Sequence, residues 1–172
     1  MSSKYSEEEV KIRPAKKEDI RIVYQMIKDL AIFHDMAHKV RMTCEELERD
    51  GFDCQPPLYH CLVAERQTAG RQLIGHAVYV PFYLASQGRT LLMDELYVKP
   101  EERGRGVGER LFRAVVKEVE RLSCHRMNFV VEKDNSARSF YQRHGAEDLS
   151  DIEGWHYFVI KNEHIRKING YQ

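Results

Sequence analysis

Residues 91–112, LLMDELYVKPEERGRGVGERLF, decide the fold more than any other part of this chain. An apolar strand pattern carrying Asp94 and Glu95 is followed by a turn that Pro100 opens, and then by an amphipathic helix. Glycines let the backbone pass close to a bulky anion, and the first N–H groups of a helix are unpaired donors at its positive end. Arg103 and Arg105 add forked donors suited to phosphate. The stretch therefore predicts a pyrophosphate-binding site directly after a strand that carries two acids.

Other interpretations of this glycine-rich turn can be judged on its residues. An ordinary strand–helix connection is the simplest of them. A P-loop needs Gly-Lys-Ser/Thr at the helix start, whereas here Glu109 follows Gly108. A Rossmann loop comes early in a βαβ unit with an acid roughly twenty residues on, and Glu132, the nearest strand-end acid, lies further away. The Arg-x-x-Gly-x-Gly pattern late in a short mixed domain therefore indicates a different anion site.

The length of the chain and its net charge limit the classes of protein to which it can belong. A chain of 172 residues suits one α/β domain, expected over residues 10–172 after a disordered tail of residues 1–9. Its 27 basic and 27 acidic residues cancel, so nothing in the charge favours nucleic acid or a membrane surface as a partner. No apolar stretch approaches the ~20 residues that span a bilayer, and residues 1–10 lack the apolar core of a signal peptide.

The cysteines and histidines predict neither a disulfide scaffold nor a metal site. The four cysteines are scattered without a C-x-x-C pair, and Cys61 lies inside the apolar run YHCLVA, as a buried thiol does. Reduced thiols fit a cytoplasmic protein. The eight histidines show no spacing typical of metal ligands.

Periodicity predicts the remaining elements. Strands are expected at residues 10–14, 59–66, 73–82, 91–98, 126–132 and 154–160, with the second and third joined as a hairpin by the turn QTAGRQ. Helical spacing follows the first strand and recurs at 109–122 and 136–144. Thr43 and Glu46 form a capping-box signal, with Gly51 as the expected helix stop. This order predicts an α/β fold with a mixed central sheet in one domain.

Two groups of residues are candidates for chemistry. Neighbours on a strand point to opposite faces, so Asp94 is expected beside Leu92, Leu96 and Val98, and Glu95 beside Met93 and Tyr97. Acids in an apolar strand are poor structural choices, which favours a functional role for at least one of them. Tyr141 is either a core residue or a phenol that donates a proton to a leaving group. Trp155 is either structural or an aromatic wall beside an amine.

The pattern resembles the GNAT family of acetyl-CoA-dependent N-acetyltransferases. The resemblance rests on DELYVKP at 94–100, RGRGVG at 103–108 and the helix from Phe140 to Gly145. Within this family, the chain resembles the spermidine/spermine and thialysine N-acetyltransferases. The motifs that support this closer resemblance are IRPA at 12–15, IKDLA at 27–31, DGF at 50–52, YHCLVAE at 59–65, DLS at 148–150 and EGW at 153–155. The resemblance covers about residues 10 to 162.

The resemblance implies roles for particular residues. Asp94 or Glu95 would act as the base, directly or through water, and Tyr141 would protonate the departing thiolate. Acetyl-CoA would be held by Leu96, Tyr97, Val98, Arg103, Gly104, Arg105, Gly106, Val107, Gly108, Glu109, Asn135 and Tyr141. The amine would be bound by Phe33, His34, Asp94, Asn128, Phe129, Val130, Glu153 and Trp155. A homodimer is the implied assembly.

The chain also departs from the family pattern. Asp94 is one methylene shorter than the family glutamate, and His34 stands where polyamine acetyltransferases carry an acid. The loop 82–88 lacks the acid and the tryptophan that grip a long polycation. The stretch up to Tyr141 is one residue shorter than typical, which leaves Asp134 or Asn135 for the asparagine position. These departures favour a smaller amine, such as thialysine, a lysine-like compound or a short diamine, over a polyamine.

The expected reaction is direct acetyl transfer to the primary amine of a small molecule, without a covalent acetyl-enzyme. Within the same class, the alternative is a protein or peptide lysine acetyltransferase. From a different class, the alternative is a CoA-binding interaction module without turnover. The retained Tyr141 and the paired acids favour the enzyme, because a pure binder needs neither.

Overall fold

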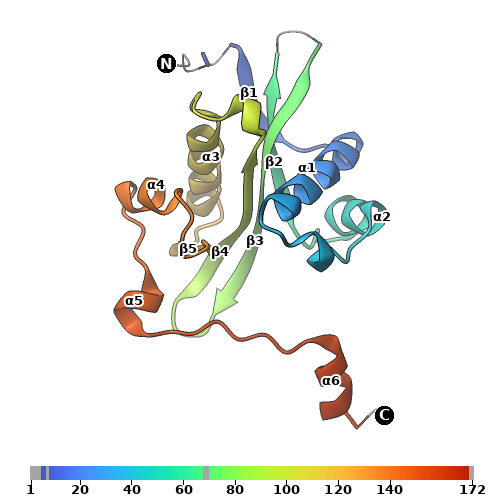
Figure 1. The fold of residues 1–172 in the computed structure, drawn as a ribbon, viewed down its shortest axis with the longest axis vertical. Coiled ribbons are helices and arrows are strands. Elements are labelled where there is room, and N and C mark those ends of the chain that lie inside the picture. Colours follow the sequence, from blue (N-terminus) through green and yellow to red (C-terminus); the bar gives the residue numbers. More distant parts are fainter. Residues whose placement is uncertain (1–4, 7, 68–69, 171–172) are drawn as a thin grey trace. The chain divides into compact units, whose positions relative to one another are not determined.

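The hairpin predicted from apolar alternation forms the centre of a five-stranded sheet. Strands β2 (His60–Arg66), β3 (Gln72–Leu84) and β4 (Gly88–Val98) pair antiparallel in that order. Strand β1 (Val10–Pro14) joins β2 antiparallel at one edge, and β5 (Arg126–Asn128) joins β4 in parallel at the other (Figure 1). The predicted α/β fold with a mixed sheet is confirmed.

The computed structural model describes residues 5–6, 8–67 and 70–170. Part of the expected tail (residues 1–4 and 7) and of the expected turn (residues 68–69) lies outside the described residues. The chain forms two compact units, residues 1–130 and 131–172. Within the described ranges, no helix has the length and apolar character needed to cross a membrane.

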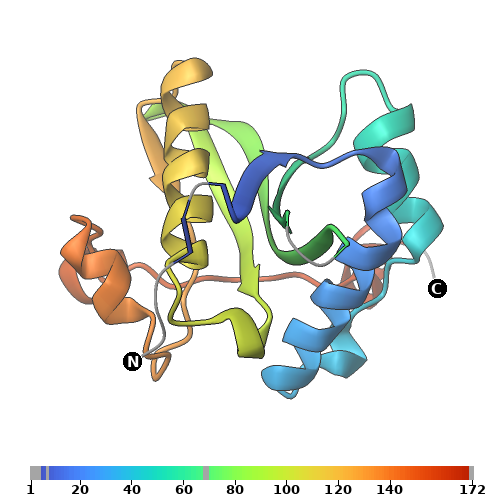
Figure 2. The ribbon, with the colours of Figure 1, turned by 90° about the horizontal axis from the view of Figure 1, so that it is seen from above.

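Helices cover both faces of the sheet in the first unit. Figure 2 shows α1 (Ile20–Phe33) and α2 (Cys44–Glu48) over one face and α3 (Val107–Arg121) over the other. The helical spacing predicted after the first strand is confirmed, since Ile20, Val23, Ile27 and Ala31 are buried and Leu30 is partly buried. The buried side of α3 is equally apolar and consists of Val107, Leu111, Phe112 and Val115. Burial of these stripes is the main force that fixes the helices to the sheet.

The capping box of α2 is confirmed, but the role predicted for Gly51 is wrong. Thr43 accepts a hydrogen bond from the Glu46 amide, and the Glu46 carboxylate accepts one from the Thr43 amide. The chain then continues through Gly51 in a π-helical turn, η3 (Arg49–Asp53). A Cβ at Gly51 would lie 2.6 Å from the ring of Tyr59, whose hydroxyl donates to the Leu47 carbonyl. The glycine therefore permits a close approach rather than ending a helix.

A β-bulge at Asp94 changes the faces predicted for β4. Val78 lies opposite Glu95 and Tyr79 lies opposite Met93, so Asp94 has no partner on β3. Tyr79 faces α3, because its hydroxyl donates to Glu118 of that helix. Cross-strand partners share a face, so Met93 also faces α3, whereas Glu95 and Tyr97 face α1. The expectation that Glu95 shares a face with Met93 was wrong, because the sequence alone does not reveal the extra residue.

The last predicted strand, residues 154–160, does not form. The second unit contains α4 (Arg138–Arg143), α5 (Leu149–Glu153) and α6 (Asn162–Ile168), with residues 154–161 connecting the last two. No backbone hydrogen bond pairs 154–160 with another described segment. Alternating apolar residues mark a strand, but a strand also needs a neighbouring edge. For the same reason β5 ends at Asn128 instead of residue 132, because its pairing with β4 covers only Thr90–Leu92.

Candidate active site

The turn between β4 and α3 presents a row of open backbone donors. After the short helix η4 (Pro100–Glu102), Gly104 and Gly106 adopt φ values of 74° and 83°, which favour glycine. In the part of the chain that the structure describes, the N–H groups of Gly104, Gly106, Val107 and Gly108 have no acceptor. A Cβ at Gly104 would meet nothing within 4 Å, so the space beside the turn is open. This arrangement fits an anion of the size of a diphosphate.

The two arginines of the turn bind protein groups. The Arg103 Nε donates to the Val98 carbonyl at 2.9 Å, and its guanidinium lies 5.1 Å from the centre of the Phe33 ring. Arg105 Nη1 donates to the Tyr5 hydroxyl at 2.6 Å and lies 3.9 Å from Glu102 Oε2. The open amides, more than the guanidinium groups, are therefore the donors available to an anion.

Glu102 anchors this turn, and the sequence interpretation missed it. Its carboxylate is buried, accepts a hydrogen bond from Arg66 Nη1 at 2.6 Å, and accepts another from the Tyr5 hydroxyl. A buried carboxylate that is paired and hydrogen-bonded resists displacement, because loss of a partner leaves a buried charge. The partners lie far away along the chain, so no local pattern could reveal them.

One edge of β4 is open within the first unit. The Lys99 N–H donates to the Ile74 carbonyl of β3 at 3.0 Å. Because backbone groups alternate in direction along a strand, Tyr97 also turns its backbone toward β3, and Leu96 and Val98 turn theirs toward the side of β5. β5 pairs only as far as Leu92, so the backbone of Leu96 lies on an edge that no described strand of the first unit covers.

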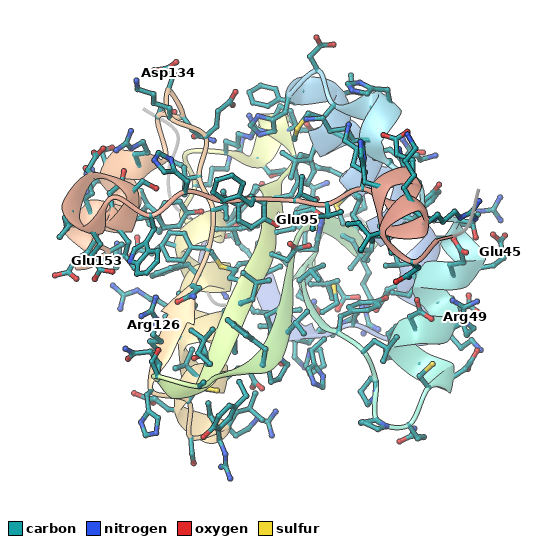
Figure 3. The ribbon with its side chains drawn as sticks, turned by 90° about the horizontal axis from the view of Figure 1, so that it is seen from below. Glu45, Arg49, Glu95, Arg126, Asp134 and Glu153 are labelled. Carbon is teal, nitrogen blue, oxygen red and sulfur yellow. The ribbon has the colours of Figure 1, made fainter. Side chains whose placement is uncertain are left out.

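The bulge separates the two acids predicted to carry chemistry. Glu95 lies on the α1 face of the sheet near the end of β4. Figure 3 shows it over the sheet, apart from Glu45 and Arg49 on the α2 region. Asp94 is exposed to solvent at the bulge, although protein atoms surround part of its carboxyl. Loss of solvent around the carboxyl, together with the charge of Glu95, raises the pKa of Asp94. Asp94 is therefore the acid that combines access with a raised pKa.

An aromatic group lies beside the turn on the α1 side. The rings of Phe33 and His34, at the end of α1, lie 5.1 Å apart edge to face, and Arg103 lies over both Phe33 and Tyr97.

At the end of β5, Asn128 accepts a hydrogen bond from Arg126 Nε, and Phe129 packs edge to face on Phe112. Val130 is exposed.

The other predicted site residues belong to the second unit. Tyr141 is half-buried in α4, and its burial raises the pKa of its phenol. The Asn135 side chain accepts a hydrogen bond from the Ala137 amide at 2.8 Å and so shapes the entry into α4. The Trp155 indole N–H donates to Glu153. The helix predicted at 136–144 is confirmed in slightly shorter form.

Comparison with known proteins identifies the class. Residues 24–146 match the model of the acetyltransferase (GNAT) family. The chain belongs to this family, and the match crosses the junction between the two units. The family predicted from the glycine turn, the two acids and the helix of Tyr141 is confirmed.

Individual relatives agree with this result. The chain is 34% identical to the thialysine N-epsilon-acetyltransferase of Bos taurus, over 94% of this chain and 98% of that protein. It is 32% identical to the spermidine/spermine N(1)-acetyltransferase-like protein 1 of Homo sapiens, over 90% of this chain and 23% of that protein. An aminoglycoside acetyltransferase from an uncultured soil sample shares the fold, with a TM-score of 0.69 at 16% identity, over 89% of this chain and 97% of that one. The prediction of an N-acetyltransferase is confirmed.

The raised pKa of Asp94 predicts a pH-dependent effect on stability. The folded state binds this proton more tightly than the unfolded chain does, so ionised Asp94 destabilises the fold at pH values above its ordinary pKa of 3.8. Asp94→Asn, which cannot ionise, should therefore gain free energy of unfolding relative to the wild type as the pH rises from about 4 to about 8. Urea denaturation across this range measures the difference. A difference that stays constant, or that also arises in the control Asp134→Asn, would contradict the expectation.

Proposed function

We propose that this protein transfers the acetyl group of acetyl-CoA directly to the primary amine of a small molecule. The observation that carries the proposal is the row of open amides at Gly104–Gly108, placed directly after a strand whose bulge exposes Asp94. Acetyl-CoA supplies an activated thioester when it is bound. The amides of 104–109 would hold its diphosphate, and the open backbone of Leu96 would pair with its pantetheine arm as an added strand does.

Asp94 is the proposed base. A lysine-like amine has a reference pKa of about 10.4, so it arrives as an ammonium and must lose a proton before it can attack. Exposed Asp94 attracts the cation, and its raised pKa makes it a better proton acceptor than an ordinary aspartate. Glu95 is turned toward α1, which supports Asp94 over Glu95 in this role.

Tyr141 is the proposed acid, as the family resemblance implies. Burial raises the pKa of its phenol, so the group keeps its proton until the thiolate departs. Asn135 has its side-chain oxygen engaged with Ala137, which leaves its amide N–H donors to approach the cofactor. Asp134 is the alternative residue for that position.

A thialysine or lysine-like amine is the proposed substrate in preference to a polyamine. The thialysine N-epsilon-acetyltransferase of Bos taurus matches this chain over nearly its full length. On the α1 side of the sheet, the guanidinium of Arg103 lies over Phe33 and Tyr97. A fixed positive charge beside the amine site repels a long polycation more strongly than a lysine-like amino acid, whose carboxylate offsets one of its two ammonium charges. The remaining proposed contacts to the amine are His34, Asn128, Phe129, Val130, Glu153 and Trp155.

A cytoplasmic location is part of the proposal. All four cysteines, Cys44, Cys54, Cys61 and Cys124, are free thiols. Free thiols are typical of a reducing compartment.

A homodimer is also part of the proposal, and the segment 155–160 supports it. Apolar side chains on both faces of this segment are at least 60% exposed, namely Trp155, Tyr157, Phe158, Val159 and Ile160. Exposed apolar surface of this extent marks an interaction site, and an unpaired strand pattern needs a sheet edge, which a second copy supplies. Sedimentation velocity should therefore show a dimer, and the double variant Tyr157→Ser/Phe158→Ser should shift it toward monomer. A wild type that stays monomeric at tens of micromolar would overturn this part of the proposal.

The substrate proposal is tested with a panel of amines. With acetyl-CoA present, release of free thiol is followed by a chromogenic reagent for thialysine, lysine, short diamines, spermidine and spermine. We expect the highest kcat/KM for thialysine or another lysine-like amine. A preference for spermine would contradict the substrate class. Silence across the panel, combined with tight CoA binding by calorimetry, would favour the non-catalytic alternative, and turnover confined to lysine-containing peptides would favour the protein acetyltransferase.

The role of Tyr141 is tested by Tyr141→Phe. General acid catalysis contributes about 10²- to 10⁴-fold, so kcat should fall by at least about 10²-fold, while the Kd of CoA from calorimetry stays within about twofold. Tyr24→Phe, which removes a hydroxyl on α1 that donates to Met42, is the matched control and should leave kcat unchanged. An undiminished kcat in Tyr141→Phe would remove Tyr141 from the acid role.

A further inference from the structure

His76 is a fully buried histidine that the proposed chemistry leaves unused. It lies on β3 with no exposed surface. Neither of its ring nitrogens has a hydrogen-bond partner among the described residues, and the same holds for one oxygen of Glu95. A buried polar atom without a partner costs about 1–3 kcal/mol. Three such atoms gathered in one place therefore require a physical reason.

The geometry brings these atoms together. His76 lies opposite Tyr97 in the register of β3 and β4, and Glu95 lies two residues before Tyr97 on the same face. The distance between His76 Nε2 and Glu95 Oε1 is 3.4 Å, and the imidazole is tilted over the Tyr97 ring at 5.8 Å. An N–H···O bond has a heavy-atom distance of about 2.7–3.2 Å, so a small rotation of either side chain closes the pair.

The surroundings favour this pairing. Most of the buried side chains on that face are apolar, including Val78, Val63 and Ile27. Cys61 on β2 lies opposite Val78, which in turn lies opposite Glu95 on β4. Burial and the charge of Glu95 raise the pKa of the Cys61 thiol. The thiol already donates a hydrogen bond to the Leu62 carbonyl. His76 Nε2, at 3.4 Å, is therefore a donor placed to reach Glu95 Oε1.

We propose that His76 is a positioning residue that donates its Nε2 hydrogen to Glu95 and keeps this carboxylate turned into the protein, leaving Asp94 alone to meet the amine. The proposal rests on the proposed function. This role explains how the site can contain two adjacent acids of which only one meets the amine. The bulge turns Asp94 and Glu95 in different directions, and His76 holds Glu95 in place. Without His76, Glu95 can turn outward, compete for the ammonium and leave the substrate in an unproductive position.

The hydrogen bond itself is tested without turnover. Long-range ¹H–¹⁵N correlation spectra of the histidine rings distinguish the two neutral tautomers, and His76→Phe identifies the signals of His76. We expect the tautomer protonated at Nε2, and a changed Nε2 shift in Glu95→Gln. The tautomer protonated at Nδ1, or a spectrum indifferent to Glu95→Gln, would overturn the proposal whether or not the protein is an enzyme.

The positioning role is tested by kinetics. His76→Phe keeps a ring of similar size but removes the donor, and kcat for the preferred amine should fall roughly 10- to 100-fold while the KM for acetyl-CoA stays unchanged. His76→Gln, whose amide can donate to Glu95, should recover most of kcat. Tyr79→Phe, on the same strand but facing α3, is the control for a general disturbance of the sheet and should leave kcat unchanged.

Two outcomes separate a positioning role from a structural one. If His76→Phe lowers the melting temperature and His76→Gln restores the melting temperature without restoring kcat, the residue is structural and the proposal fails. If the wild type transfers no acetyl group to any amine, the proposed function fails, while the ring spectra still decide whether His76 binds Glu95.

Discussion

The single extra residue in β4 is the constraint on which the rest of the site depends. Without the bulge, strict alternation would place Glu95 beside Met93 on one face and Asp94 beside Leu96 on the other. With it, Met93 and Leu96 both face α3, Glu95 faces α1, and Asp94 has no partner across the ladder. The bulge thus leaves the apolar packing under α3 intact and still allows an acid to reach solvent. A bulge beside an active site commonly serves to re-aim a side chain, and this one does so for two.

The same strand links three further features. Its last residues have an open backbone edge, because β5 is too short to cover them. Beyond it, after η4, Gly104 and Gly106 take left-handed conformations and expose a series of amides. Buried Glu102 fixes this turn through Arg66 and Tyr5. A preorganised donor array stabilises charge more effectively than a mobile one, since it need not reorder when the anion binds.

Local patterns in the sequence predicted most of the fold, because periodicity and caps depend on neighbouring residues. The stripe of α1, the capping box at Thr43 and the hairpin of β2 and β3 are of this kind. The features that the sequence did not predict depend on contacts between residues that lie far apart along the chain. Gly51 is required by Tyr59 across the core, Glu102 is paired with Arg66 and Tyr5, and the bulge at Asp94 exists only in the register with β3. The segment 154–160 has the pattern of a strand but pairs with no other segment of the described chain. The sequence around His76 is that of any histidine in an apolar strand, and only the contact with Glu95 on the neighbouring strand distinguishes it.

The exposed segment at 155–160 also determines what the chain reveals spectroscopically. Trp155 is the only tryptophan in the sequence, and the residue is 67% exposed. Intrinsic indole fluorescence of this protein therefore reports on the segment 155–160. A blue shift of its emission signals that a ligand or a second copy of the chain covers this segment.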